Sequence, residues 1–192
     1  GGTAGHINPA LAVADYIKEN HPDAEISYIG TADKLEARLV PEKGYAFYTI
    51  DVAGFQRKLS LKNIERNISA AVKAVTSSAA SKKLLKEIQP DIVVGTGGYV
   101  SGPVLREAKK LGIKTAIHEQ NAFPGVTTKM LASKADRVML AMPEAEKYLK
   151  LRKEPVITGN PVRGELLKIS RDEARAKLGL DGRPLILSFG GS

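Results

Sequence analysis

Short apolar runs alternate along this sequence with longer segments whose apolar residues recur at helical spacing. A continuous apolar run at residues 91–95, between turn signals, is typical of a strand buried on both faces of a parallel sheet. The pattern predicts strands at 25–29, 45–50, 91–95, 114–118, 137–140 and 156–158. Helices are expected after Asn8, near 35–40, and at about 61–88, 101–111, 126–132, near 148, and 170–178. Strands alternating with helices predict an α/β fold with a parallel sheet and right-handed crossovers.

The sequence opens with a glycine-rich loop, Gly1-Gly2-Thr3-Ala4-Gly5-His6. Asn8 suits an N-cap and Pro9 suits the first helical position, so the first helix is expected to begin there. Glycines before a helix N-terminus leave backbone N–H groups accessible, which favours a phosphate or another oxyanion. An ordinary strand-to-helix turn explains the glycines equally well, because the loop matches neither G-x-G-x-x-G nor a Walker sequence.

Polar or glycine-rich segments follow several other predicted strands. In an open parallel sheet ligands bind at the carboxyl ends of the strands, so these segments are expected to meet at one rim. They are the opening loop and residues 96–99, 118–121, 160–163 and 190–192.

The balance of charge favours anionic partners. Lysine and arginine number 29 against 21 aspartate and glutamate residues, giving a formal net charge of +8. Such an excess suits nucleic acid, a phospholipid surface or a phosphorylated substrate. Aromatic residues make up only 5% and no helix carries clustered arginines, so nucleic acid is not the expected partner.

Metal and membrane-spanning roles are also disfavoured by composition. The absence of cysteine excludes disulfides and thiolate zinc sites, and three scattered histidines argue against a metal site. No apolar run reaches the ~18 residues of a membrane span, and a cytoplasmic protein is expected.

The two ends of the sequence suggest a fragment of a two-domain protein. A glycine-rich loop of this type normally follows a strand, so a first strand is expected before Gly1. The apolar run 185–189 leads into a second glycine pair and predicts the first strand of a second α/β unit. The expected division is an N-terminal domain at 1–160, a linker and helix at 161–183, and the second unit from 184 to 192.

Five motifs in order resemble those of glycosyltransferase family 28, in particular its enzymes that add N-acetylglucosamine to the undecaprenyl-linked muramyl-pentapeptide (lipid I) of peptidoglycan synthesis. The motifs are Gly1 to His6, Thr96-Gly97-Gly98-Tyr99-Val100-Ser101-Gly102-Pro103, His118-Glu119-Gln120-Asn121-Ala122, Gly159-Asn160-Pro161-Val162-Arg163 and Gly190-Gly191-Ser192. The resemblance covers the whole chain, which corresponds to the N-terminal domain and the first strand of the C-terminal one.

The resemblance implies a GT-B fold, in which two Rossmann-like domains face each other across a cleft and no metal or other cofactor is required. It implies that the N-terminal domain mainly holds the lipid acceptor and the C-terminal domain mainly holds the donor, UDP-N-acetylglucosamine. The reaction would invert the anomeric centre and give a β-1,4 linkage, forming lipid II. A chain ending at residue 192 would be inactive alone.

The resemblance also assigns contacts to particular residues. The family's donor contacts fall on Thr3, Ala4, Gly5, Asn121, Arg163 and Ser192. The loops Gly1 to His6 and Thr96 to Tyr99, including Gly97 and Gly98, would meet the acceptor's diphosphate. Two positions depart from the family pattern: Ala4 stands where many members have glycine, and Thr128 where asparagine is expected, so no contact is assigned to Thr128.

His6 and Glu119 are the two candidates for the base that takes the proton of the attacking hydroxyl. His6 has a suitable unperturbed pKa and lies on the glycine loop, but it could instead only order that loop. Glu119 could be the base or could support its neighbours. His118 is expected to be packed and to orient Glu119 and Asn121.

The acceptor's lipid would have to stay in the bilayer while its head group reaches the cleft. A basic and apolar segment from about Phe55 to Val75 is therefore expected to dock on the anionic cytoplasmic leaflet, as a peripheral contact. A normal amphipathic helix packed on the sheet is the alternative for part of this region. Other GT-B enzymes, such as a glycolipid glycosyltransferase or a nucleotide-sugar epimerase, remain alternative functions.

Overall fold

The computed structural model describes residues 3–52, 61–164 and 168–188 as alternating helices and strands. The elements are α1 (Ala4–Asn20), β1 (Ser27–Gly30), α2 (Glu36–Glu42), β2 (Ala46–Thr49), α3 (Leu61–Ile88), β3 (Ile92–Gly95), α4 (Gly98–Lys110), β4 (Lys114–Glu119), α5 (Val126–Leu131), β5 (Arg137–Leu140), the 3₁₀ helix η1 (Pro143–Tyr148), β6 (Val156–Ile157) and α7 (Arg171–Lys177).

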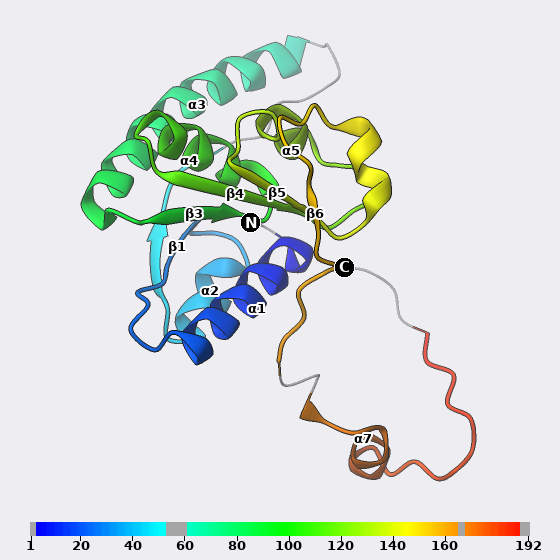
Figure 1. Cartoon of the computed structure of the whole chain (residues 1–192). Coiled ribbons are helices and arrows are strands. Elements are labelled where there is room, and N and C mark those ends of the chain that lie inside the picture. The colour runs from blue at the N-terminus through cyan, green and yellow to red at the C-terminus, as the bar shows by residue number, and fades with distance from the viewer. Residues whose placement is uncertain (1–2, 53–60, 165–167, 189–192) are drawn as a thin grey trace.

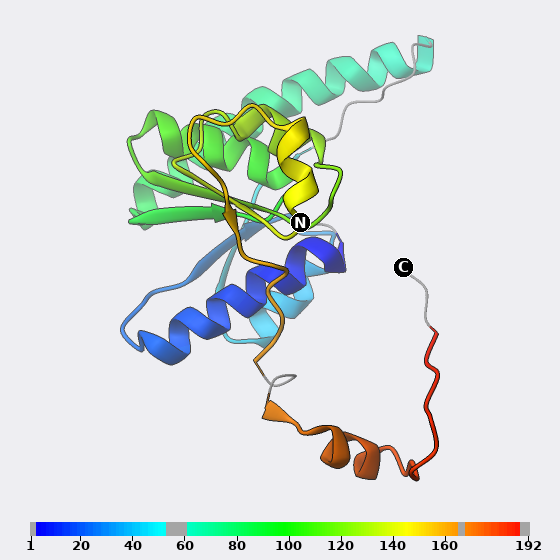
Figure 2. The same ribbon diagram turned by 45° about the vertical axis from the view of Figure 1, so that its right-hand side comes forward.

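All strand pairs in the described residues are parallel. The strands form a two-stranded sheet, β1-β2, and a four-stranded sheet, β3-β4-β5-β6. Helices α3, α4 and α5 lie on one side of the strands, whereas α1 and α2 lie on the other (Figures 1 and 2). The predicted α/β fold with parallel strands is therefore confirmed, and helices cover both faces.

Short apolar strands and helix faces build the core between these layers. Ile117 of β4 and Leu140 of β5 are fully buried and pack with Leu105 of α4 and Leu131 of α5. Burying side chains of this size contributes about 1.5–3 kcal/mol each, so this cluster holds β4 against α4, which precedes it, and α5, which follows it. The carboxyl end of β4 is thereby held in place.

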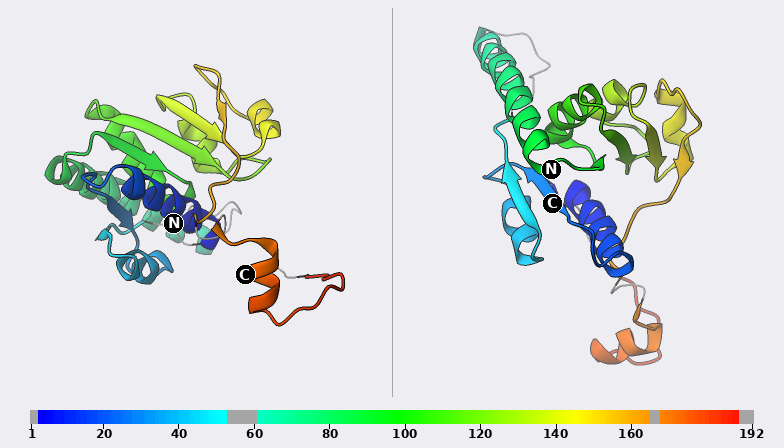
Figure 3. Two further views of the ribbon diagram at one scale, coloured as in Figure 1. Left: turned by 60° about the horizontal axis from the view of Figure 1, so that its bottom comes forward. Right: turned by 60° about the vertical axis from the view of Figure 1, so that its left-hand side comes forward.

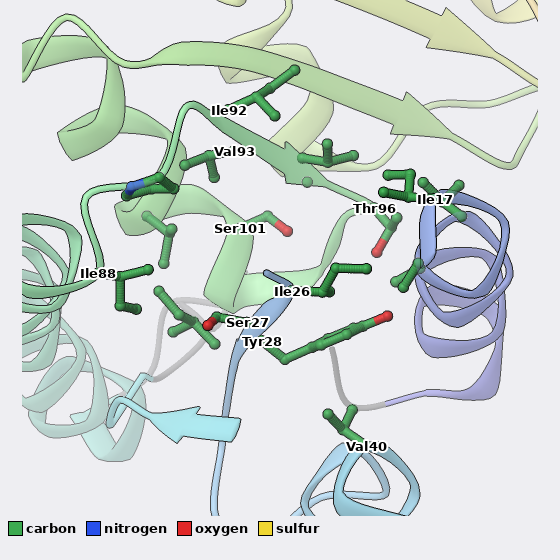
Figure 4. A pocket seen from close by; sticks show the side chains of 18 of the residues that line it. Ile17, Ile26, Ser27, Tyr28, Val40, Ile88, Ile92, Val93, Thr96 and Ser101 are labelled. Carbon is green, nitrogen blue, oxygen red and sulfur yellow. The ribbon is translucent and has the colours of Figure 1, made fainter. Parts of the chain in front are cut away.

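An apolar cavity of about 620 Å³ separates β1 from β3 (Figure 4). Residues 26–29 and 92–95 line it from the two strands, and α1 contributes Ile7, Ala10 and Ile17. Among the described strands, β1 pairs only with β2 and β3 only with β4, so one edge of each faces the cavity. Figure 3 shows the two groups of strands from two further sides.

This cavity corrects one prediction. The run at 91–95 was expected to be buried on both faces, but Ile92 is 54% exposed and Val94 is 38% exposed. Both side chains line the cavity. The run is apolar enough for a central strand, yet in the described structure β3 stands at the edge of its sheet.

The first helix begins earlier than the sequence pattern predicts. Thr3, not Asn8, is the N-cap, and its carbonyl accepts hydrogen bonds from His6 N at 3.0 Å and Ile7 N at 3.2 Å. These bonds close a helical turn inside the glycine loop, so Pro9 lies within α1. A proline there removes the bond to the carbonyl of Gly5 but does not end the helix.

The region after β6 matches the prediction in part. A helix was predicted at 170–178, and α7 begins there with a capping box formed by Ser170 and Glu173. Residues 184–188 form no strand in the structure, in contrast to the prediction, and Leu185, Ile186 and Leu187 are exposed. A strand needs a neighbour for its hydrogen bonds, and none of the described strands pairs with this segment.

Candidate active site at the strand ends

Loops from three parts of the chain meet at the carboxyl ends of β3 and β4. Thr96, directly after β3, donates a hydrogen bond from Oγ1 to the carbonyl of His6 at 2.8 Å. Thr127 of α5 donates to the carbonyl of Gly98, the first residue of α4, at 3.2 Å. The starts of α1, α4 and α5 are therefore joined at one rim, which brings together the opening loop and residues 96–99 of the five predicted segments, whereas residues 190–192 lie outside the described residues.

The N-termini of helices α1 and α4 lie at this rim. The first-turn N–H groups of Ala4 and Gly5 in α1, and those of Gly98 and Tyr99 in α4, have no acceptor within their helices. A helix N-terminus carries a partial positive charge and favours an anion. The rim thus has the chemistry of a phosphate site.

His6 lies in the first turn of α1, half-buried. Its Nδ1 is 3.0 Å from Oγ1 of Thr3. Burial lowers the pKa of His6 below its usual value of 6.5, so the ring is neutral at pH 7. A neutral imidazole with one nitrogen engaged has the other available to exchange a proton.

Gly97 makes room for the His6 ring. A Cβ at this position would lie 2.9 Å from Cδ2 of His6 and 3.0 Å from its Nε2. The backbone of Gly97, at φ 97° and ψ −170°, is also in a region that only glycine adopts readily. The loop therefore requires glycine for two independent reasons.

Replacing Gly97 by alanine is expected to lower the free energy of unfolding by about 1–3 kcal/mol from backbone strain. It should also displace the His6 ring toward solvent and move its pKa back up toward 6.5. Gly112→Ala is the matched control, because Gly112 has φ 77° but nothing within 4 Å of the added Cβ. Chemical denaturation and NMR titration of His6 measure both effects. An unchanged His6 pKa in Gly97→Ala would contradict this account.

Glu119, the last residue of β4, is buried and only 3% exposed. Its Oε1 accepts from Asn121 N at 3.1 Å and Asn121 Nδ2 at 2.9 Å, and its Oε2 accepts from Gly125 N at 3.0 Å and Thr128 Oγ1 at 2.5 Å. Burial alone would raise the pKa of this carboxyl, but these hydrogen bonds outweigh it and hold the pKa below its usual value. Glu119 is ionised at neutral pH.

His118 uses both ring nitrogens within the protein. Its Nε2 lies 3.0 Å from the carbonyl of Gly159, and its Nδ1 lies 3.0 Å from Nε2 of Gln120. The ring is buried, at 2% exposure. His118 is therefore packed, as expected. Its contact with the Gly159 carbonyl connects the end of β4 to the segment after β6.

The other predicted site residues differ in how closely they approach the rim. Tyr99 and Asn121 are exposed beside it, and Arg163 is exposed in the segment that follows β6. Ser192 lies outside the described residues. The segment from Phe55 to Val75 was expected to dock on a membrane. Its residues 55–60 also lie outside the described residues, and its last residue, Val75, is exposed.

Thr128 is a site residue that sequence reasoning missed. It was set aside because it departs from the family pattern, yet it is 1% exposed and donates the shortest of the four hydrogen bonds to Glu119. A lone threonine in a short helix gives no sequence signal for such a contact. Only the packing of α5 against the end of β4 reveals it.

Within the described ranges 3–52, 61–164 and 168–188, no helix combines the length and apolar character needed to cross a membrane. No three histidine, aspartate or glutamate side chains in those ranges come close enough together to hold a metal ion.

Comparisons with known proteins agree on one family. The model of the glycosyltransferase family 28 N-terminal domain matches residues 1–140. The chain is 52% identical, over its full length, to the UDP-N-acetylglucosamine–N-acetylmuramyl-(pentapeptide) pyrophosphoryl-undecaprenol N-acetylglucosamine transferase of Acetivibrio thermocellus. It is 51% identical to the enzyme of the same name from Ruminiclostridium cellulolyticum. These alignments cover 51% and 52% of the two relatives, so the chain spans about half their length.

A solved structure shows the same fold. The crystal structure of Acinetobacter baumannii MurG superimposes with a TM-score of 0.67 at 34% sequence identity, over 83% of this chain and 43% of that one. The parallel sheets and flanking helices described above therefore resemble part of the GT-B fold of MurG.

Proposed function

This chain belongs to glycosyltransferase family 28, and from that premise we propose that it is the acceptor-binding N-terminal half of an N-acetylglucosaminyltransferase of peptidoglycan synthesis. The donor is UDP-N-acetylglucosamine and the acceptor is undecaprenyl-diphospho-MurNAc-pentapeptide, lipid I, which is converted to lipid II. The observation that carries the proposal is the neutral His6 between two helix N-termini at one strand-end rim. Relatives at about half identity that are named for this transfer support the choice of substrates.

The acceptor's diphosphate is proposed to bind at the starts of α1 and α4. The first-turn N–H groups of Gly5, Gly98 and Tyr99 have no acceptor within their helices, and the two helix dipoles add to them. Gly97 lets the backbone come close to a ligand, because its turn has no side chain. The exposed Tyr99 ring is proposed to contact the acceptor sugar.

His6 is proposed as the base. The oxygen of the muramyl C4 hydroxyl attacks C1 of N-acetylglucosamine, the bond from C1 to the diphosphate of UDP breaks with its electron pair, and the hydroxyl proton passes to Nε2 of His6. Nε2 can accept a proton only if Nδ1 carries the ring hydrogen. Thr3, 3.0 Å from Nδ1, supports this tautomer by accepting that hydrogen on Oγ1.

The donor would be held mainly by the second domain. Thr3, Ala4, Gly5 and Asn121 on this half are proposed to contact it, with Arg163 and Ser192 near the boundary. The fork of the Arg163 guanidinium suits a diphosphate. No metal ion or other cofactor is proposed to take part.

The division of the chain follows the same proposal. Residues 1–160 would form the acceptor domain, 161–183 the linker and its helix, and 184–192 the start of the donor domain. The segment from Phe55 to Val75 would dock on the anionic cytoplasmic face of the membrane, with about 1 kcal/mol available per basic residue near the surface.

Transfer assays on the protein with both domains test the proposal. Lipid I should be glycosylated from UDP-N-acetylglucosamine, whereas diacylglycerol should not. Glycosylation of diacylglycerol would favour a glycolipid glycosyltransferase, and epimerisation of the nucleotide sugar without any lipid would favour an epimerase. Residues 1–192 alone are expected to be inactive, so efficient transfer by them would contradict the proposed division.

A further inference from the structure

Every accepting position of the Glu119 carboxylate is used inside the protein. A carboxylate has about four acceptor sites, and Asn121, Gly125 and Thr128 together donate four hydrogen bonds to them. Glu119 would have to give up one of these bonds to take a proton from a substrate. The carboxylate of Glu119 is therefore held in place by four hydrogen bonds, and we call it the anchor of the loop that follows β4.

The anchor organises the loop between β4 and α5. Backbone N–H groups from both ends of the loop, Asn121 and Gly125, point at the same carboxylate. The loop is thus closed around a buried charge. Removing that charge would leave these donors without an acceptor, which is costly for buried groups.

The anchor also sets the orientation of the Asn121 amide. An ionised carboxylate only accepts hydrogen bonds, so the NH₂ group of Asn121 must face it, 2.9 Å from Oε1. The amide oxygen, Oδ1, is therefore turned away from Glu119. Since Asn121 is exposed, this oxygen is available to a ligand.

Thr128 fixes the carboxylate from the other side. Its hydroxyl donates to Oε2 at 2.5 Å, and its side chain is 1% exposed, so water cannot replace the bond. At 1% exposure the side chain offers almost no surface to a ligand at the rim. Its hydroxyl can act on a ligand through the bond to Glu119.

We propose that Glu119 and Thr128 are positioning residues that hold Asn121 with its amide oxygen toward the ligand, where it accepts a hydrogen bond from a hydroxyl or N–H group of a sugar substrate. This assignment rests on the proposed transferase function. It assigns Glu119 a role other than that of the base, and it gives Thr128 a role.

A first experiment needs no turnover. Thr128→Val keeps the shape of the side chain but removes its hydroxyl, and in the protein with both domains it should speed hydrogen exchange at the Asn121 and Gly125 amides at least tenfold. Thr128→Ser retains the hydroxyl and should restore wild-type exchange. Thr115→Val is the matched control, because Thr115 is a buried threonine at the opposite end of β4 from Glu119 and donates to a different carboxylate, that of Asp136, at 2.9 Å. It should leave exchange at Asn121 and Gly125 unchanged.

A second experiment uses steady-state kinetics with UDP-N-acetylglucosamine and lipid I. Thr128→Val should raise KM for one of the two sugar substrates about tenfold, the equivalent of one hydrogen bond, with a smaller change in kcat.

Glu119→Gln should lower kcat/KM more strongly but leave the acid limb of its pH profile in place. Loss of that limb in Glu119→Gln would identify Glu119 as the base and overturn the inference. Wild-type exchange and KM in Thr128→Val would overturn it as well. If the unmodified protein transfers no sugar, the proposed function fails, while the exchange experiment still tests the positioning of the loop.

Discussion

Replacing His6 by alanine in the protein with both domains is expected to lower kcat about 10²–10⁴-fold, the range typical of a lost general base. KM for lipid I should change much less, because the helix N-termini that would hold the diphosphate remain. The expectation rests on the half-buried ring in the first turn of α1, with Thr3 beside its Nδ1. Steady-state kinetics with both substrates measure the two parameters separately.

If His6 is the base, its pKa determines how the activity depends on pH. A protonated imidazole cannot accept a proton, so activity should fall as the pH drops through the pKa of His6. Because burial lowers that pKa, the acid limb of kcat/KM should have its midpoint below 6.5. The limb should disappear in His6→Ala.

His21→Ala provides the control for His6→Ala. His21 is exposed at the end of α1, and its backbone N–H bonds to the carbonyl of Ile17 in a way that alanine preserves. Its kcat and pH profile should match those of the unmodified protein. A His6→Ala variant that keeps kcat within about threefold of wild type would show that the base lies elsewhere.

The sequence predicted the parallel α/β architecture and the meeting of the opening loop with the segment after β3, because both follow from local patterns and the order of the elements. Apolar runs such as 137–140 are bounded by turn signals, and β5 has the predicted bounds, Arg137–Leu140. Parallel strands place their carboxyl ends at one edge, so the meeting of His6 with Thr96 followed from the order of elements.

The sequence could not predict which residue at the rim acts as the base and which has a positioning role. His6 and Glu119 are both reasonable bases by residue type, and they differ only in what surrounds them. Four hydrogen bonds fix Glu119, including one from Thr128, which lies nine residues away on another element. The start of α1 was misplaced for a similar reason: Asn8 and Pro9 match the statistics of a helix start, but the Thr3 carbonyl closes an earlier turn.

An apolar strand joined to Gly1 is expected to fill the cavity between β1 and β3 and to raise the stability of the chain. The α1 helix starts beside the carboxyl end of β3, since Thr96 bonds to the carbonyl of His6. A strand that leads into α1 would therefore run parallel to both β1 and β3. With α1 it would form a right-handed crossover to β1, the arrangement that parallel sheets almost always adopt.

The walls of the cavity define what such a strand must be. Helix α1 lines the cavity with Ile7 and Ile17. Helix α4 contributes Val104, and α3 contributes Leu85. A strand there would be buried on both faces, so it should be a continuous run of about five apolar, preferably β-branched residues. It would also cover Ile92, which is 54% exposed.

The test compares two versions of the chain with different N-terminal extensions. One carries a short run of valine and isoleucine before Gly1, and the control carries the same run interrupted by a proline and an aspartate. Each buried apolar side chain contributes about 1.5–3 kcal/mol, against about 1–2 kcal/mol for ordering each residue. With hydrogen bonds to two strand edges added, the apolar extension should raise the free energy of unfolding by about 3 kcal/mol relative to the control.

Hydrogen exchange distinguishes filling of the cavity from non-specific stabilisation. The backbone N–H groups of β1 and β3 on the edges that face the cavity should become protected only with the apolar extension, whereas those of β5, which already pairs on both sides with β4 and β6, should change little. Equal stability of the two versions, or protection spread evenly over all strands, would show that the cavity does not accept a strand. Protection confined to β1 and β3 would mean that the two described sheets are parts of one continuous parallel sheet, with the glycine loop and His6 at the end of its central strand.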